Sequence, residues 1–424
     1  MTITCRSAHV AALVSLALLS ACAAATREQA GRGENALRDR SAAHVPPPPK
    51  HADIDLPEVV VVASPLEERA LGELDETQLF DCGVRAFDAA DWNRAAACFS
   101  RLADAFPASE RVGAATFNSA LSLERLQRYG DALARWEADI ALIVAAEKSR
   151  APKDAALKPT SDEIDATFHA AFAEHELGRL DAAATRLKTL SERPGIPDSR
   201  KGEALVQQAV CLVERAEHAR KAGERDPALL AGRGDAEHLL RAALELYAKA
   251  GTDGEADPAL LAQAEFWIGE IYRSYFDETT LDPGTQNEKA LGAALETKAQ
   301  FLLSAQGHYL RAIRRGDGEW ATASGYRIGE LYESLHQQMI DAPMPKLTHD
   351  EVAVYREELK KKVRVLIEKA MKIYEQTLAT AERVNAQSDY VRKTHEALER
   401  MRAMLIEEKP HAAAPGAAPA PRVN

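Results

Sequence analysis

Two histidines, His169 and His175, are the first arrangement in this sequence that could hold a metal ion. They are six positions apart, so on a helix they point about 120° away from each other and do not share a face. A metal ion needs side chains that converge on one point. We therefore expect each histidine to be a surface residue or a hydrogen-bonded core residue.

The chain contains none of the common catalytic signatures. There is no G-x-S-x-G elbow, no G-x-x-x-x-G-K-[ST] phosphate loop and no H-E-x-x-H zinc helix. Gly316-Asp317-Gly318 follows no predicted strand, so it indicates a turn between helices. The sequence also has no C-x-x-C pair for a structural zinc ion. We expect no catalytic residue, no cofactor and no metal, and hence a protein that is not an enzyme.

Composition favours a helical protein. The 424 residues are 46% hydrophobic but only 6% aromatic, and alanine occurs in almost every window. Alanine favours helices and lacks the branched side chain of strand residues, which argues against an all-β protein. The apolar content also argues against a wholly disordered chain. The net charge of −12 implies no broad cationic surface, so no nucleic-acid partner is expected.

The N-terminus carries a short targeting segment. Within residues 1–21, one cation (Arg6) precedes an uncharged run over residues 10–21, which is too short to span a bilayer as a helix. The run ends in Leu19-Ser20-Ala21-Cys22, which resembles the lipobox of bacterial lipoproteins. This resemblance implies that residues 1–21 are a signal peptide and that Cys22 is acylated. Ala23 follows instead of the Asp of the inner-membrane retention signal, which favours a lipid anchor on the periplasmic face of the outer membrane.

Three cysteines then remain in the mature chain: Cys82, Cys98 and Cys211. In an oxidising compartment Cys82 and Cys98 could form a disulfide. The alternative is that all three are small buried side chains, as free cysteines commonly are. We favour the second interpretation.

Proline-rich segments border the body of the chain. Residues 22–70 are predicted to be a flexible Pro-rich tether, and residues 408–424 a disordered Ala/Pro tail. Within the tether, Val59, Val60, Val61 and Val62 lie between prolines and favour an extended strand. Such a strand could add to a partner's sheet or pack on the protein's own helices. Segment 56–65 also resembles the TonB box, which implies an adaptor coupled to a TonB-like energy transducer.

The body contains internal repeats. Gly83 is followed by Ala95 after 12 residues, by Phe99 after 16 and by Pro107 after 24. These spacings resemble the tetratricopeptide repeat (TPR), in which small residues let two antiparallel helices touch and an aromatic residue fills the gap. The alanine-then-large step recurs at Ala132/Trp136, Ala183/Leu187, Ala243/Tyr247, Ala305/Tyr309 and Ala370/Tyr374, and the segment Phe266–Tyr272 recurs at Tyr326–Tyr332.

The resemblance implies an all-α, TPR-like helical-hairpin solenoid of about six helix pairs over residues 71–407. We expect a helix of more than thirty residues near 350–385 and a last helix near 388–407. Gly83 is expected to face Ala95, and Trp136 to lie in the core. Arg233-Gly234-Asp235 is predicted to be a loop that caps a helix beginning at Ala236.

Stacked helix pairs expose a surface that usually binds a peptide or another protein. The sequence therefore predicts a lipid-anchored periplasmic scaffold for protein–protein interaction in a bacterial envelope complex for transport, motility, wall maintenance or outer-membrane assembly. Its partners would be other envelope proteins or peptides, and the membrane through the lipid. Two alternatives are the TonB-coupled adaptor and an envelope enzyme without a recognisable motif.

Overall fold

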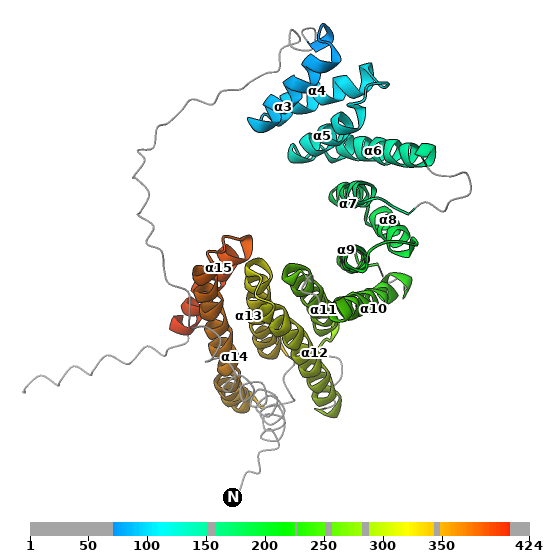
Figure 1. Cartoon of the computed structure of the whole chain (residues 1–424). Coiled ribbons are helices and arrows are strands. Elements are labelled where there is room, and N and C mark those ends of the chain that lie inside the picture. Colours follow the sequence, from blue (N-terminus) through cyan, green and yellow to red (C-terminus); the bar gives the residue numbers. More distant parts are fainter. Residues whose placement is uncertain are drawn as a thin grey trace, which may run out of the picture. The chain divides into compact units, whose positions relative to one another are not determined.

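A computed structural model describes residues 71–150, 158–224, 227–250, 257–281, 288–342 and 348–407. These residues form thirteen helices and no strand (Figure 1). Most successive helices pack on one another, as in helical hairpins. The predicted all-α class and hairpin organisation are therefore confirmed for the described part of the chain, and the number of helix pairs stays a prediction.

The described residues fall into two compact units that meet in sequence between Gly232 and Arg233, inside α10 (Pro227–Ala250). In the N-terminal unit each helix packs on the next in sequence, and α7 also touches α9. Its helices are α3 (Glu76–Asp88), α4 (Trp92–Ala105), α5 (Val112–Arg125), α6 (Tyr129–Arg150), α7 (Ser161–Glu176), α8 (Leu180–Glu192) and α9 (Asp198–Lys221).

The C-terminal unit has longer helices and a second layer of contacts. Besides the contacts between successive helices, α11 packs on α13 and α13 on α15. That these helices continue the first unit in one array over residues 71–407 stays a prediction. The helices of this unit after α10 are α11 (Pro258–Glu278), α12 (Glu288–Arg314), α13 (Gly318–Asp341), α14 (His349–Val384) and α15 (Asp389–Glu407).

Local sequence fixes the helix ends. Asp75 accepts from the backbone N–H of Gln78 and the Gln78 side chain accepts from the N–H of Asp75, a capping box that starts α3. The long helix α14 spans 36 residues, as expected, and stops at Asn385, whose φ of 51° lies in the left-handed region.

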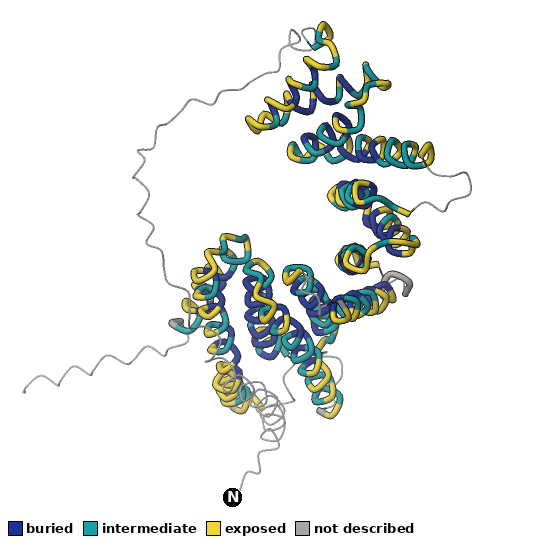
Figure 2. Tube along the Cα trace, in the orientation of Figure 1, coloured by how far each residue is buried: buried dark blue, intermediate teal, exposed yellow. Residues whose placement is uncertain are grey.

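Close helix contacts depend on glycine, but the partner differs from the expected one. A Cβ atom on residue 83 would lie 2.5 Å from Cε1 of Phe99, and one on residue 269 would lie 2.6 Å from Cε1 of Tyr309. The aromatic ring itself, and not the preceding alanine, therefore occupies the space that glycine leaves. Figure 2 shows the buried residues along the sides by which neighbouring helices touch.

Two local predictions were wrong. Residues 233–235 lie inside α10, which begins at Pro227, because Arg233 is 5% exposed and gains partners there: its guanidinium donates to Ser274 Oγ and Glu278. Cys82 and Cys98 form a disulfide between α3 and α4, because the hairpin brings their Cα atoms to 6.0 Å. Cys211 is a buried free thiol, as expected.

Candidate functional site

The first three helix pairs share one register. In each pair a small residue on the first helix, defined here as position 0, is followed by alanine at +12 and by a large residue at +16 on the second helix. All nine side chains or glycine positions are buried. The three sets are Gly83/Ala95/Phe99, Ala120/Ala132/Trp136 and Ala171/Ala183/Leu187.

The same register places large apolar residues at two further positions of each first helix. Positions −3 and +1 are four residues apart, so they lie on one face of their helix. Phenylalanine occupies position −3 in all three helices, and none of the six side chains is buried. Val84 is 37% exposed and Phe172 is 43% exposed. We call this set the apolar face: Phe80 and Val84 on α3, Phe117 and Leu121 on α5, and Phe168 and Phe172 on α7.

Aromatic contacts link the part of the face on α5 to the part on α7. Phe117 meets the buried Trp136 edge-on at a centroid distance of 5.2 Å, and Trp136 stacks on His169 at 4.5 Å. Tyr129, at the start of α6, lies edge-on to Phe172 at 5.8 Å. Trp136 is fully buried, as predicted.

Arginines cover two of the phenylalanine rings. The Arg111 guanidinium lies 5.1 Å from the ring centre of Phe80, and that of Arg200 lies 4.6 Å from Phe168. Arg200 also forms an ion pair with Asp165. These contacts hold one face of each of the two rings and leave Val84 and Phe172 exposed.

His169 and His175 do not meet at a common site. His169 Nδ1 lies 3.0 Å from Glu124 Oε2, the oxygen that also accepts from Trp136 Nε1 at 3.1 Å. His175 Nε2 lies 2.5 Å from Glu214 Oε2, and this hydrogen bond raises the pKa of His175. Each histidine is thus satisfied by a carboxylate, as expected. The described residues contain no cluster of three or more side chains suited to a metal ion.

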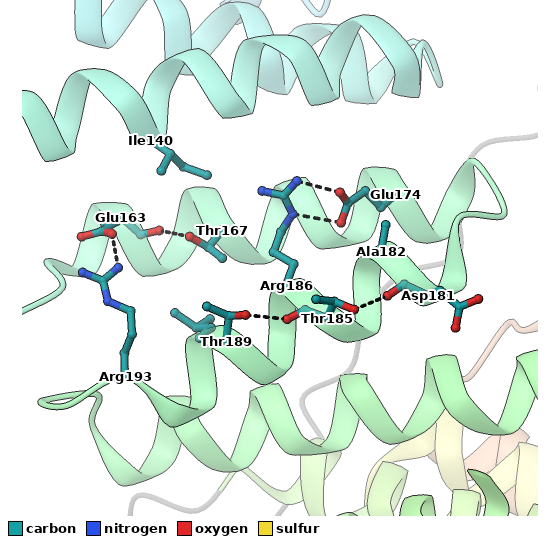
Figure 3. A pocket seen from close by; sticks show the side chains of 11 residues that line it. Ile140, Glu163, Thr167, Glu174, Asp181, Ala182, Thr185, Arg186, Thr189 and Arg193 are labelled. Carbon is teal, nitrogen blue, oxygen red and sulfur yellow. Dashed lines mark hydrogen bonds and ion pairs between the residues drawn. The ribbon is translucent and has the colours of Figure 1, made fainter. Parts of the chain in front are cut away.

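A cavity of about 610 Å³ opens between α6, α7 and α8 (Figure 3). Its charged groups neutralise one another: Arg186 holds Glu174 through two nitrogen–oxygen contacts of 2.9 and 2.6 Å, and Arg193 pairs with Glu163. Both glutamates are nearly buried. The cavity is a structural junction, because its principal ionic groups already have partners. It is lined by Ile140, Glu163, Thr167, Glu174, Asp181, Ala182, Thr185, Arg186, Thr189, Leu190 and Arg193.

In the C-terminal unit position +1 is ionic, whereas position −3 is aromatic, Phe266 in α11 and Tyr326 in α13. Position 0 is here the glycine that faces the large residue of the next helix, Gly269 facing Tyr309, although the spacing is longer than 16. The residue after it, Glu270, accepts from the Tyr309 hydroxyl at 2.5 Å. Arg327 of α13 lies 3.1 Å from the same carboxylate. Burial raises the pKa of Glu270, but Arg273 and Arg327 outweigh that effect and hold it below the usual range. Position +1 therefore carries an apolar side chain in the N-terminal unit and a glutamate of a charge network in the C-terminal unit.

Sequence reasoning missed the apolar face, although its signal was present. Phe80, Phe117 and Phe168 each lie three residues before the small residue and 15 residues before the alanine of their pair, so extending the repeat pattern toward the start of the first helix would have aligned them. The predicted site residues Cys22 and Val59–Val62 lie outside the described residues. Within the described helices, none has a stretch long and apolar enough to cross a membrane.

Comparison with known proteins adds no relative. No family model matches the chain, and no curated protein matches it.

Proposed function

We propose that this protein is a lipid-anchored scaffold that binds another protein or peptide in the periplasm of a bacterial envelope. The observation that carries the proposal is the apolar face on α3, α5 and α7. Large apolar side chains that recur at equivalent positions and stay partly exposed, with Val84 and Phe172 the most accessible, support a binding surface. Aromatic residues are also the side chains that most often dominate binding energy at interfaces.

Two further features support the location. The disulfide between Cys82 and Cys98 is of a kind that persists in oxidising compartments, including the bacterial periplasm. The lipobox-like sequence ending at Cys22 supports anchoring at a membrane by acyl chains. Replacing Cys22 by serine should release the protein from membrane fractions. Retention of the Cys22→Ser variant in those fractions would contradict the anchor.

The binding proposal is tested by crosslinking in the native envelope with Phe172→Asp. This change places a charge on the α7 part of the apolar face at a residue that is 43% exposed, so folding should be little affected. If Phe172 is a central contact, affinity should fall by about 30-fold or more, as for other aromatic interface residues.

The matched control is Val365→Asp on α14, at an apolar residue with 39% exposure. The control should keep every crosslinked partner that the native chain captures. If the two variants and the native chain crosslink to the same partners, the proposal that the apolar face binds these partners is contradicted.

A further inference from the structure

We propose that the valine segment 56–65 of the same chain docks on the apolar face and that a partner must displace it. This inference rests on the proposed function, because it uses the same face. It names the occupant of that face when no partner is bound: the segment with Val59, Val60, Val61 and Val62.

The chemistry of the segment matches that of the face. Residues 59–65 carry no charge, and the six residues of the apolar face carry none either. Four consecutive β-branched residues favour an extended chain, in which side chains on one side are about 6.6 Å apart. Positions −3 and +1 of one helix are about 6 Å apart, so two alternate valines can sit beside such a pair.

One polar atom on the rim has no partner in the described structure. Nη1 of Arg111, the arginine that covers the ring of Phe80, is buried and makes no hydrogen bond there. Glu58 directly precedes the four valines. When the valines lie along the neighbouring apolar positions, the Glu58 carboxylate comes next to the Arg111 guanidinium, and a turn of the arginine side chain brings the buried Nη1 to this acceptor.

The linker is long enough for this contact. Val62 precedes Leu71, the first described residue before α3, by nine residues, which span at most about 30 Å when extended. A flexible linker of this length has an r.m.s. span of about 17 Å. Leu71 packs against the same core cluster as Phe80, so the part of the face on α3 lies within this reach. A tethered segment at this distance has an effective concentration on the order of millimolar.

Competition between the segment and a partner follows from this arrangement. A partner binds the apolar face only by replacing the valines, so the segment lowers its apparent affinity. Replacing all four valines by serine should increase partner capture, because serine removes the apolar contacts and leaves the linker unchanged.

The contact is tested by crosslinking within the full-length chain. Val61→Cys is combined with Val84→Cys on the face, and the matched control combines Val61→Cys with Ala97→Cys on the exposed side of α4. A short bismaleimide is the probe. Cys82 and Cys98 are already bonded and Cys211 is buried, so none of them competes. Cys5 and Cys22 are replaced by serine in both pairs, so that neither can react with the probe.

We expect the face pair to crosslink at least tenfold faster than the control pair, and Phe172→Asp to lower the rate of the face pair. Equal rates for the two pairs would overturn the proposal.

The outcomes separate this inference from the proposed function. If the two pairs crosslink at equal rates and Phe172→Asp loses its partners, docking of the segment is contradicted and the proposed scaffold function is supported. Faster crosslinking of the face pair without any partner in the envelope supports docking and overturns the scaffold. A third outcome is that the two pairs crosslink at equal rates and that Val60→Pro no longer binds a partner that the native chain binds. In that case the segment does not dock on the apolar face but adds as a strand to that partner.

Discussion

Replacing Gly83 by alanine sets two opposing effects against each other at one position. In the middle of a helix, alanine is favoured over glycine by about 1 kcal/mol, so propensity alone predicts stabilisation. The new Cβ would, however, lie 2.5, 2.6 and 2.7 Å from three ring carbons of Phe99, whose side chain is 1% exposed and has little room to move. Overpacking of this kind costs about 1–3 kcal/mol. We expect Gly83→Ala to lower the free energy of unfolding by about 1 kcal/mol.

A second substitution isolates the steric cause. In the third helix pair the corresponding residues are Ala171 and Leu187, so the double variant Gly83→Ala/Phe99→Leu copies a combination that the chain already uses. The double variant should therefore be more stable than the sum of the two single changes predicts, by about 1–2 kcal/mol.

The assay is urea unfolding followed by far-UV circular dichroism and by tryptophan emission. Trp92 reports on the first hairpin because it contacts Phe87 at 5.0 Å. The control is Gly234→Ala in α10, where no atom lies within 4 Å of the added methyl group. This variant should gain about 0.5–1 kcal/mol. Stabilisation by Gly83→Ala equal to that of Gly234→Ala would refute the steric reasoning.

Three further predictions concern buried charge and the disulfide. Burial raises the pKa of Asp139 from 3.8 to about 6, so the folded state holds a proton that the unfolded state releases between these values, and stability falls as pH rises through that window. Asp139→Asn should therefore raise the free energy of unfolding at pH 7 by at most about 3 kcal/mol. It should also flatten the pH dependence of urea unfolding between about pH 4 and 6. An unchanged pH dependence would contradict this prediction. Cys98→Ser opens the 16-residue loop to Cys82 and should cost about 3 kcal/mol, and reductant should destabilise only the native chain by the same amount. Glu270→Gln leaves Arg327 without its buried carboxylate and should cost about 3 kcal/mol in thermal unfolding, whereas a loss below about 0.5 kcal/mol would show that the ion pair is not needed.

The repeat pattern predicted the helices because it depends on local rules. Alanine, the capping residues and the prolines between helices all act within a few positions of the chain, so the number and order of helices could be read from the sequence. The error at residues 233–235 has a tertiary cause. Gly234 and Asp235 indicate a turn by propensity, but Arg233 gains Ser274 and Glu278 as partners only if the helix continues through them.

The disulfide and the apolar face were missed for a different reason. Pairing of Cys82 with Cys98 depends on how two helices pack, and two cysteines 16 residues apart are equally compatible with separate buried thiols. The apolar face is defined by the solvent exposure of its side chains, which the sequence does not give. Phe117 and Phe168 do pack against core clusters from one side, and only the packed hairpins reveal that they stay partly exposed and that Val84 and Phe172 are exposed.

The chemistry of the large residue that packs against the small residue of each first helix explains why the two units differ at position +1. This large residue is at +16 in the N-terminal unit, and it is Tyr309 opposite Gly269 and Tyr374 opposite Gly329 in the C-terminal unit. A buried tyrosine needs a partner for its hydroxyl. Tyr309 reaches Glu270, and Tyr374 reaches Glu333 at 3.1 Å. These glutamates in turn attract arginines, among them Arg327, so the surface beside them fills with ion pairs.

In the N-terminal unit, the +16 residues Phe99 and Leu187 have no polar atom to satisfy, so no acid is required on the facing first helix. Position +1 is then free for Val84 and Phe172. Trp136 has one N–H, and Glu124 at position +4 accepts it without displacing Leu121 from position +1. The large residue that packs between the two helices of each hairpin thus determines whether the neighbouring surface is ionic or apolar. Phe99→Tyr would bury a hydroxyl opposite Val84, where the apolar face offers no acceptor.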